Sequence, residues 1–242
     1  VGSDFMISIV DSIILILLLF GAIIGFKTGV IKSAVSFLGT ILIIYLAFVL
    51  KNPISEFMYL HLPFFNFSGD LAGVTVLNIL IYEGLAFLIC FAILEILLKV
   101  VVFASGILEK ILRLTIVFGL FSKILGLIFG FIEYYCIIFT GLFLISIFNP
   151  STTVIKDSKL ASSILNNTPV LKSTFASPKA AIDEILELQN TYKDDKTGYN
   201  EAAFSILIKY NIITKNQAEK LINTKKIDIK NPYAIIGSTK EN

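Results

Sequence analysis

The sequence predicts an all-α polytopic membrane protein with four transmembrane helices and a small helical C-terminal extension. Hydropathy is the first observation: 56% of the 242 residues are hydrophobic, 16% are charged and the mean hydropathy is +0.85. A soluble domain has about 45–50% apolar residues and about a quarter charged ones. Charge placement is the second, because 13 of the 20 Lys and Arg and 10 of the 18 Asp and Glu follow residue 150. We therefore expect a four-span membrane domain over residues 6–150 and a polar helical tail over 151–242, with residues 1–5 a cloning remnant.

Four apolar runs are long enough to cross a bilayer, which takes about 20 mostly apolar residues. They cover residues 7–26, 30–50, 71–103 and 124–148. Each run is expected to be a helix, because backbone groups in lipid must bond within their own segment. The third run is too long for one perpendicular span, so we expect it to leave the membrane near Lys99.

The connections between the spans are also patterned. Pro53 and Pro63 exclude one continuous helix between the second and third spans. The Phe and Met residues around them favour an interfacial or re-entrant segment over a free loop. Residues 107–113 predict a short amphipathic helix on the membrane surface, with Lys110 and Arg113 on its polar face.

Three helices are expected in the tail. Ser177 is the expected N-cap of the first, with Pro178 in its first turn, and Asn200 is expected to open the second. Thr214 and Gln217 have the spacing of a capping box at the start of the third. A module this small is marginal alone, so we expect it to dock on the membrane domain or on a partner.

Positive charge predicts the orientation, because cytoplasmic loops carry an excess of Lys and Arg. Loops one and three carry six basic residues, whereas loop two and the start of the tail carry three. The six are Lys27, Lys32, Lys99, Lys110, Arg113 and Lys123, and the three are Lys51, Lys156 and Lys159. We therefore expect loops one and three to be cytoplasmic and both termini to be extracytoplasmic.

Small residues recur at every fourth position in two spans. They are Gly21, Gly25 and Gly29 in the first span and Ser122, Gly126 and Gly130 at the start of the fourth. Helices in lipid associate by close packing, and such spacing lets two backbones approach. The alternative is ordinary membrane-helix composition, in which glycine is common. We expect a specific helix–helix seam, either within the chain or between copies, and within the chain the best pairing is the first span with the fourth.

Four acidic residues, Asp11, Glu83, Glu95 and Glu133, fall within or beside the spans, where ionisable groups are costly and often functional. Asp11 is expected at the membrane interface, and Glu95 is expected to pair with Lys99 one turn later. Glu83 and Glu133 have no basic residue within one turn. Both are expected near mid-membrane, where they meet and at least one carries a proton at neutral pH. They are then either a hydrogen-bonded structural pair or part of a transport path.

Signs of enzymatic chemistry are absent from the sequence. There is one histidine, His61, and there are two cysteines, Cys90 and Cys136, without the spacing of a metal site or a catalytic set. A net charge of +2 does not suggest nucleic acid. We expect a non-enzyme without cofactor or metal. Its expected partners are membrane lipid, a second copy of the chain, or an envelope protein bound through the tail.

Three groups of residues carry a family resemblance. The first is Asp11 with the turn Gly25-Phe26-Lys27-Thr28-Gly29, and the second is Ser122-Lys123 followed by Gly126 and Gly130. The third is the segment DSKLASSILNNTPVL after the fourth span, in which a serine precedes a short helix. Together they resemble the bacterial colicin V production protein family over residues 6–175. This sequence departs from the family pattern, which usually has Asp or Asn where Ser122 stands and Arg where Lys123 stands, and often has a basic residue near Glu133.

The resemblance implies a four-span inner-membrane protein linked to toxin export and envelope homeostasis. It also implies relatives in which the membrane unit anchors an extracytoplasmic protease. The leading hypothesis is a scaffold or accessory factor. The alternatives are a small proton-coupled transporter or channel that uses Glu83 and Glu133, and a membrane anchor for an extracytoplasmic partner.

Overall fold

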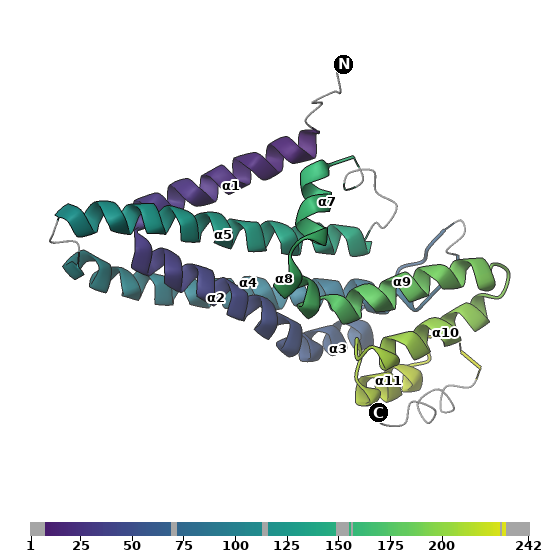
Figure 1. Cartoon of the computed structure of the whole chain (residues 1–242). Coiled ribbons are helices and arrows are strands. Elements are labelled where there is room, and N and C mark those ends of the chain that lie inside the picture. Colours follow the sequence, from purple (N-terminus) through teal and green to yellow (C-terminus); the bar gives the residue numbers. More distant parts are fainter. Residues whose placement is uncertain are drawn as a thin grey trace, which may run out of the picture. The chain divides into compact units, whose positions relative to one another are not determined.

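All the described regular structure is helical (Figure 1). The computed structural model describes residues 8–68, 72–112, 116–148, 155, 157–227, 229 and 230, with side chains except at 104–112, 116–118, 147, 148 and 170. Four helical segments are long and apolar enough to cross a membrane: Ile9–Thr28, Val30–Leu50, Leu77–Phe103 and Gly119–Ser146. The predicted all-α polytopic membrane fold is thus confirmed.

The described residues of the apolar part of the chain form five helices. They are α1 (Ile9–Thr28), α2 (Val30–Leu50), α3 (Asn52–His61), α4 (Leu77–Leu112) and α5 (Ile116–Phe148). A capping box starts α1, in which Ser8 and Asp11 each bond the other's backbone N–H. Only Gly29 separates α1 from α2, and its φ of 87° is a conformation that suits glycine. The two spans therefore form a tight helical hairpin.

The third span differs from the prediction at both ends. Its helix begins at Leu77 rather than at residue 71, because residues 72–76 form turns around Gly73, whose φ is 82°. The helix then continues to Leu112, so the predicted separate surface helix over residues 107–113 is instead the end of α4. Arg113 and the Lys110 side chain lie outside the described residues.

The described residues after the spans include the short helices α7 (Lys159–Asn166), α8 (Pro169–Thr174), α9 (Ala176–Thr191), α10 (Lys196–Lys209) and α11 (Lys215–Asn223). The capping box of Thr214 and Gln217 is confirmed at the start of α11. The predicted caps Ser177 and Asn200 are wrong. The N-cap position of α9 is Phe175, and α10 is capped by Asp195, whose Oδ1 accepts from the Gly198 N–H at 2.9 Å.

Contacts divide the chain into two compact units. The first contains residues 1–48 and 91–173, and the second contains residues 49–90 and 174–242. The predicted boundary at residue 150 separates apolar from polar sequence, whereas these units each combine residues from both sides of it. In the second unit the tail helices share one hydrophobic core with α3 and the start of α4, around Tyr59, Val76, Ile79, Phe204 and Leu207. The tail therefore docks on residues of the predicted membrane domain.

Candidate functional site

Helices α1 and α5 run side by side in the first unit and touch through backbone (Figure 1). A Cβ placed on Gly25 would lie 2.8 Å from the carbonyl carbon of Gly126 and 3.0 Å from the Cα of Gly130. A Cβ on Gly126 would lie 3.0 Å from the Cα of Gly29, and one on Gly21 would lie 2.6 Å from the Tyr134 side chain. The structure thus brings the two predicted sets of glycines together. We call this contact, made by Gly21, Gly25 and Gly29 with Gly126 and Gly130, the glycine seam.

Residues of the first loop and of the start of the fourth span lie around the end of this seam. Ser122 is fully buried, and its Oγ accepts from the backbone N–H of Val30 at 3.0 Å. It therefore satisfies one of the N–H groups that the first turn of α2 leaves without a helical partner. The Lys123 ammonium lies 5.6 Å from the centre of the Phe26 ring, a cation–π contact. Lys27 is exposed and Lys32 is half-buried.

Asp11 binds the segment that follows the fourth span. Its carboxylate is 6% exposed, and one oxygen accepts from the Ser158 hydroxyl and from the Leu160 N–H at 3.0 Å. Ser158 is the N-cap of α7, and its Oγ also accepts from the Ala161 N–H at 2.9 Å. The acid before the first span and the serine before the short helix, which both contribute to the family resemblance, are thus partners. The sequence placed Asp11 at an interface but did not identify this partner.

A polar cluster lies inside the spans of the first unit, where α2, α4 and α5 each contribute. The Ser36 hydroxyl donates to Glu133 at 2.6 Å. The hydroxyl of fully buried Thr40 lies 3.5 Å from Glu133 Oε1 and 3.4 Å from Glu95 Oε1. Glu95 was expected to pair with Lys99, whose charge attracts it, and its described hydrogen-bond partner is Thr40. The carboxyl group nearest to Glu133 in this cluster therefore belongs to Glu95.

The predicted meeting of Glu83 with Glu133 is wrong. Because α4 begins at Leu77, Glu83 lies in its second turn, about 9 Å along the helix at about 1.5 Å per residue, and not near mid-membrane. It forms an ion pair with Lys51, and the two side chains are 4% and 6% exposed. Sequence reasoning missed this partner because it looked within one helical turn, whereas Lys51 is 32 residues away.

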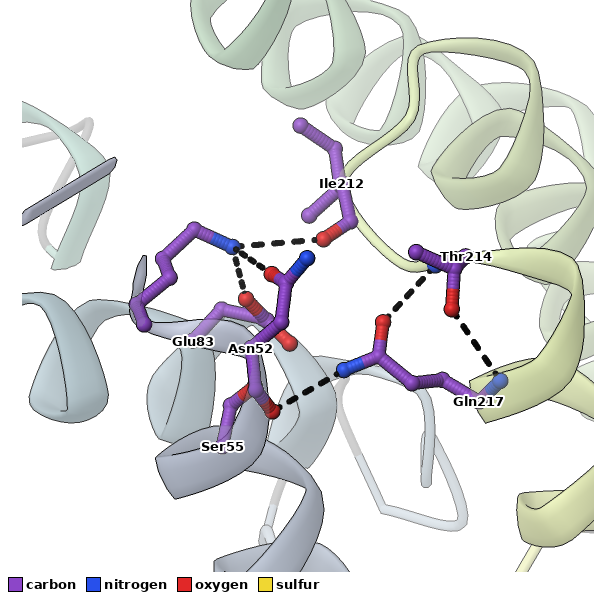
Figure 2. Close-up of polar contacts among 7 residues, drawn as sticks. Asn52, Ser55, Glu83, Ile212, Thr214 and Gln217 are labelled. Carbon is purple, nitrogen blue, oxygen red and sulfur yellow. Dashed lines mark hydrogen bonds and ion pairs between the residues drawn. The ribbon is translucent and has the colours of Figure 1, made fainter. Parts of the chain in front are cut away.

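Figure 2 shows the surroundings of this ion pair in the second unit. The Lys51 ammonium also lies 3.4 Å from Asn52 Oδ1 and 3.4 Å from the Ile212 carbonyl. Gln217 extends the contact by donating to the Asn52 carbonyl at 3.1 Å. Burial raises the pKa of nearby Tyr59, with the Glu83 charge as the second cause. The tail thus holds the junction of α2 and α3 through polar contacts.

Buried polar groups in the second unit are incompletely satisfied. Glu83 Oε1, Tyr59 OH and Thr75 Oγ1 are buried without a hydrogen-bond partner among the described residues. Such groups cost free energy, so the Lys51–Glu83 pair is better suited to fixing geometry than to adding stability. Within the described residues no three His, Cys, Asp or Glu side chains are placed to hold a metal ion.

The four spans and the glycine seam define a multi-pass helical membrane protein. The chain belongs to the colicin V production protein family, which it matches over residues 10–169. It is 30% identical to the uncharacterized transmembrane protein YshB of Bacillus subtilis (strain 168) over 172 residues, which are 66% of this chain and 92% of that protein. No solved structure matches it. The family is not a known enzyme family, and helices α9, α10 and α11 lie beyond the matched residues.

Proposed function

We propose that the chain is a non-enzymatic scaffold or accessory factor of the bacterial inner membrane that acts in toxin export and envelope homeostasis. The glycine seam is the observation that carries this proposal. Gly25, Gly126 and Gly130 omit side chains where the backbones of α1 and α5 meet, which favours a fixed helical frame. Asp11 and Ser158 add a buried polar contact to the same frame. The residues behind the family resemblance that have described partners thus serve packing and capping.

The proposed orientation places both termini and the tail outside the cytoplasm. The six basic residues of loops one and three, against three elsewhere, support it. One of those three, Lys51, is buried against Glu83, so its charge is balanced within the protein. A tail on that side would recruit an extracytoplasmic envelope partner, and a second copy of the chain is a further proposed partner.

A second candidate function is a small proton-coupled transporter or channel. The cluster of Glu95, Glu133 and Thr40 favours it, because two carboxyl groups share one hydroxyl within the spans. Intramembrane carboxyl groups of this kind carry protons in pumps and transporters. In this version Glu83 has no part, since it is paired with Lys51.

Replacing carboxyl groups by amides separates the two candidates. Glu133→Gln keeps the shape and an oxygen that accepts from Ser36, but it cannot exchange a proton. We expect cells that depend on this chain to secrete toxin normally with Glu133→Gln. We also expect purified wild-type chain in liposomes to show no flux driven by a pH gradient. Loss of secretion by a well-folded Glu133→Gln chain, together with wild-type flux that this variant abolishes, would establish the transporter instead. Glu187→Gln, an exposed tail substitution, is the matched control.

A further inference from the structure

The segment between α2 and α4 presents an exposed apolar surface outside the spans. Pro53, Phe57 and His61 are exposed at four-residue spacing on one side of α3, and exposed Leu62 and Phe65 follow within four residues of His61. Phe57, Leu62 and Phe65 are 59%, 37% and 54% exposed. The His61 ring stacks on Phe57 with 4.5 Å between ring centres. We call these five residues the aromatic surface.

The opposite face of α3 is covered by the tail. Ser55, Met58 and Tyr59 are buried there, and Met58 and Tyr59 belong to the core that contains α9, α10 and α11 residues. Helix α3 therefore carries apolar side chains on both its buried face and its exposed face. Protein covers one face, while the other face exposes large apolar groups, a pattern that marks a site of interaction.

No unpaired carboxylate or ammonium group lies on the aromatic surface. The two formally charged residues of 51–68 are Lys51 and Glu56, and both are in ion pairs, with Glu83 and with Lys220 of the tail. Carbonyl groups at the C-terminal end of α3 also have a hydrogen-bond donor. The Lys226 ammonium lies 2.9, 2.8 and 2.9 Å from the carbonyl oxygens of residues 59, 60 and 62. A segment with its charges and carbonyls bonded internally is suited to contact with lipid.

The depth of the segment follows from its bonds to the start of α4. The Asn78 side chain accepts from the Phe65 N–H at 2.6 Å and donates to the Phe65 carbonyl at 3.1 Å. The Tyr82 hydroxyl donates to the Pro63 carbonyl at 2.5 Å. Tyr82 is five residues after Leu77, so these bonds hold the segment within about 8 Å of the helix start. Interfacial helices bury their apolar faces about 5–10 Å into the boundary of headgroups and acyl chains.

We propose that the aromatic surface inserts into the lipid interface and that α3 is an interfacial helix rather than a re-entrant one. The partner is the bilayer itself, because only Lys51 separates the end of α2 from the start of α3, and α4 returns to the membrane at Leu77. The tail helices, seated on the covered face of α3, are thereby held at the membrane surface. This inference rests on the membrane-spanning fold and is independent of which side of the membrane the tail occupies.

Tryptophan fluorescence tests the proposal directly, since the chain contains no tryptophan. Single-tryptophan variants Phe57→Trp and Phe65→Trp are reconstituted in phosphatidylcholine vesicles with bromine at acyl carbons 6 and 7 or at carbons 11 and 12. Ile89→Trp, 43% exposed near the middle of the third span, serves as the deep reference. Asp194→Trp, on the exposed tail surface, serves as the aqueous reference.

We expect at least twofold quenching of Phe57→Trp and Phe65→Trp by the shallow bromines, and weaker quenching by the deep ones. Ile89→Trp should show the reverse order, and Asp194→Trp should be quenched only by iodide in the water. Stronger quenching by the deep bromines would make the segment re-entrant and would overturn the proposal. Quenching by iodide alone would place the surface in water, and protection from both quenchers would place it against protein; either result would also overturn it. Both leaflets carry bromine, so these outcomes do not depend on the proposed orientation.

Discussion

Alanine at the glycine seam provides the sharpest test of how α1 and α5 are held together. Gly25→Ala adds one methyl group that would lie 2.8 Å from the Gly126 carbonyl carbon and 3.0 Å from the Gly130 Cα. Carbon atoms in contact prefer about 3.5–4.0 Å. Both obstructing groups are backbone, which cannot rotate away as a side chain can. The Gly126 carbonyl oxygen would lie closer still, so the helices must separate by at least about 0.5–1 Å, a gap that weakens their other contacts by about a quarter to a half.

The net effect is the difference between two opposing terms. Alanine in a helix is favoured over glycine by about 0.8–1 kcal/mol. Overpacking of a close contact costs about 1–3 kcal/mol. We expect the overpacking cost to lie near the upper end of its range, because the obstructing groups are backbone. Gly25→Ala and Gly126→Ala should then each lower the free energy of unfolding by about 1–2 kcal/mol. Because the two residues share one contact, their effects should not add.

Two other glycines provide matched controls. Gly141 lies in the fourth span, and a Cβ there has nothing within 4 Å, so Gly141→Ala should be neutral or stabilising. A Cβ on Gly39 would lie 2.8 Å from Leu98 Cδ2 and 3.1 Å from Leu98 Cγ. That obstruction is the end of a flexible side chain, so Gly39→Ala should fall between Gly141→Ala and the seam variants.

A thiol-reactive fluorogenic dye measures the series in detergent, because Cys90 and Cys136 are free and buried and react on unfolding. One kcal/mol corresponds to about 2–4 °C in the midpoint for a chain of about this size. We expect Gly25→Ala to melt about 2–8 °C below wild type, by the same conversion. Equal midpoints for Gly25→Ala and Gly141→Ala would refute the reasoning, because they would show that close contact at the seam does not hold the helices.

Three further predictions follow from other parts of the molecule. Lys51→Met should lower the free energy of unfolding by about 3–5 kcal/mol, because it leaves the Glu83 carboxylate buried without its partner. Adding Glu83→Gln to this variant should recover part of the loss. A double-mutant cycle on thermal midpoints that shows no coupling between the two residues would contradict this prediction. A cysteine at Asp194 in a cysteine-free chain should react with a membrane-impermeant maleimide in intact cells, and labelling only after the inner membrane is lysed would reverse the proposed orientation. Burial raises the pKa of Tyr199 from 10.0 to about 12, so the stability that its protonated hydroxyl contributes is complete below pH 10 and is lost between pH 10 and 12. Tyr199→Phe should reduce the fall of the melting midpoint over that pH range. An unchanged pH profile of the midpoint would contradict the raised pKa of Tyr199.

Local sequence signals predicted much of the fold and the seam. The apolar runs predicted four spans, the fourfold spacing of Gly25 and Gly29 marked one side of the seam, and Thr214 and Gln217 predicted a capping box. Each of these depends on residues within a turn or two of one another. The start of α4 was misplaced because residues 71–76 are mostly apolar, although the positive φ of Gly73 belongs to a turn ahead of the helix.

The partners of the charged groups were not predictable in the same way. Asp11 and Ser158 are 147 residues apart, and Lys51 and Glu83 are 32 apart. Which groups meet depends on which helices are neighbours and how far each is shifted along its axis. A shift of six residues in the start of α4 moves Glu83 by about 9 Å, at about 1.5 Å per residue. That distance is enough to change its partner from another carboxyl group to a lysine at the end of α2.

The tail supplies hydrogen-bond partners for backbone groups of the predicted membrane domain. Asn200 accepts from the N–H groups of Thr75 and Val76 at 3.0 and 3.3 Å, just before α4, and donates to the Gly73 carbonyl at 3.0 Å. Lys226 binds the carbonyls at the end of α3. Backbone groups beside lipid need such partners because little water is present to supply them. Helices α9, α10 and α11, which lie beyond the family match, therefore form one compact unit with residues 49–90 of the predicted membrane domain.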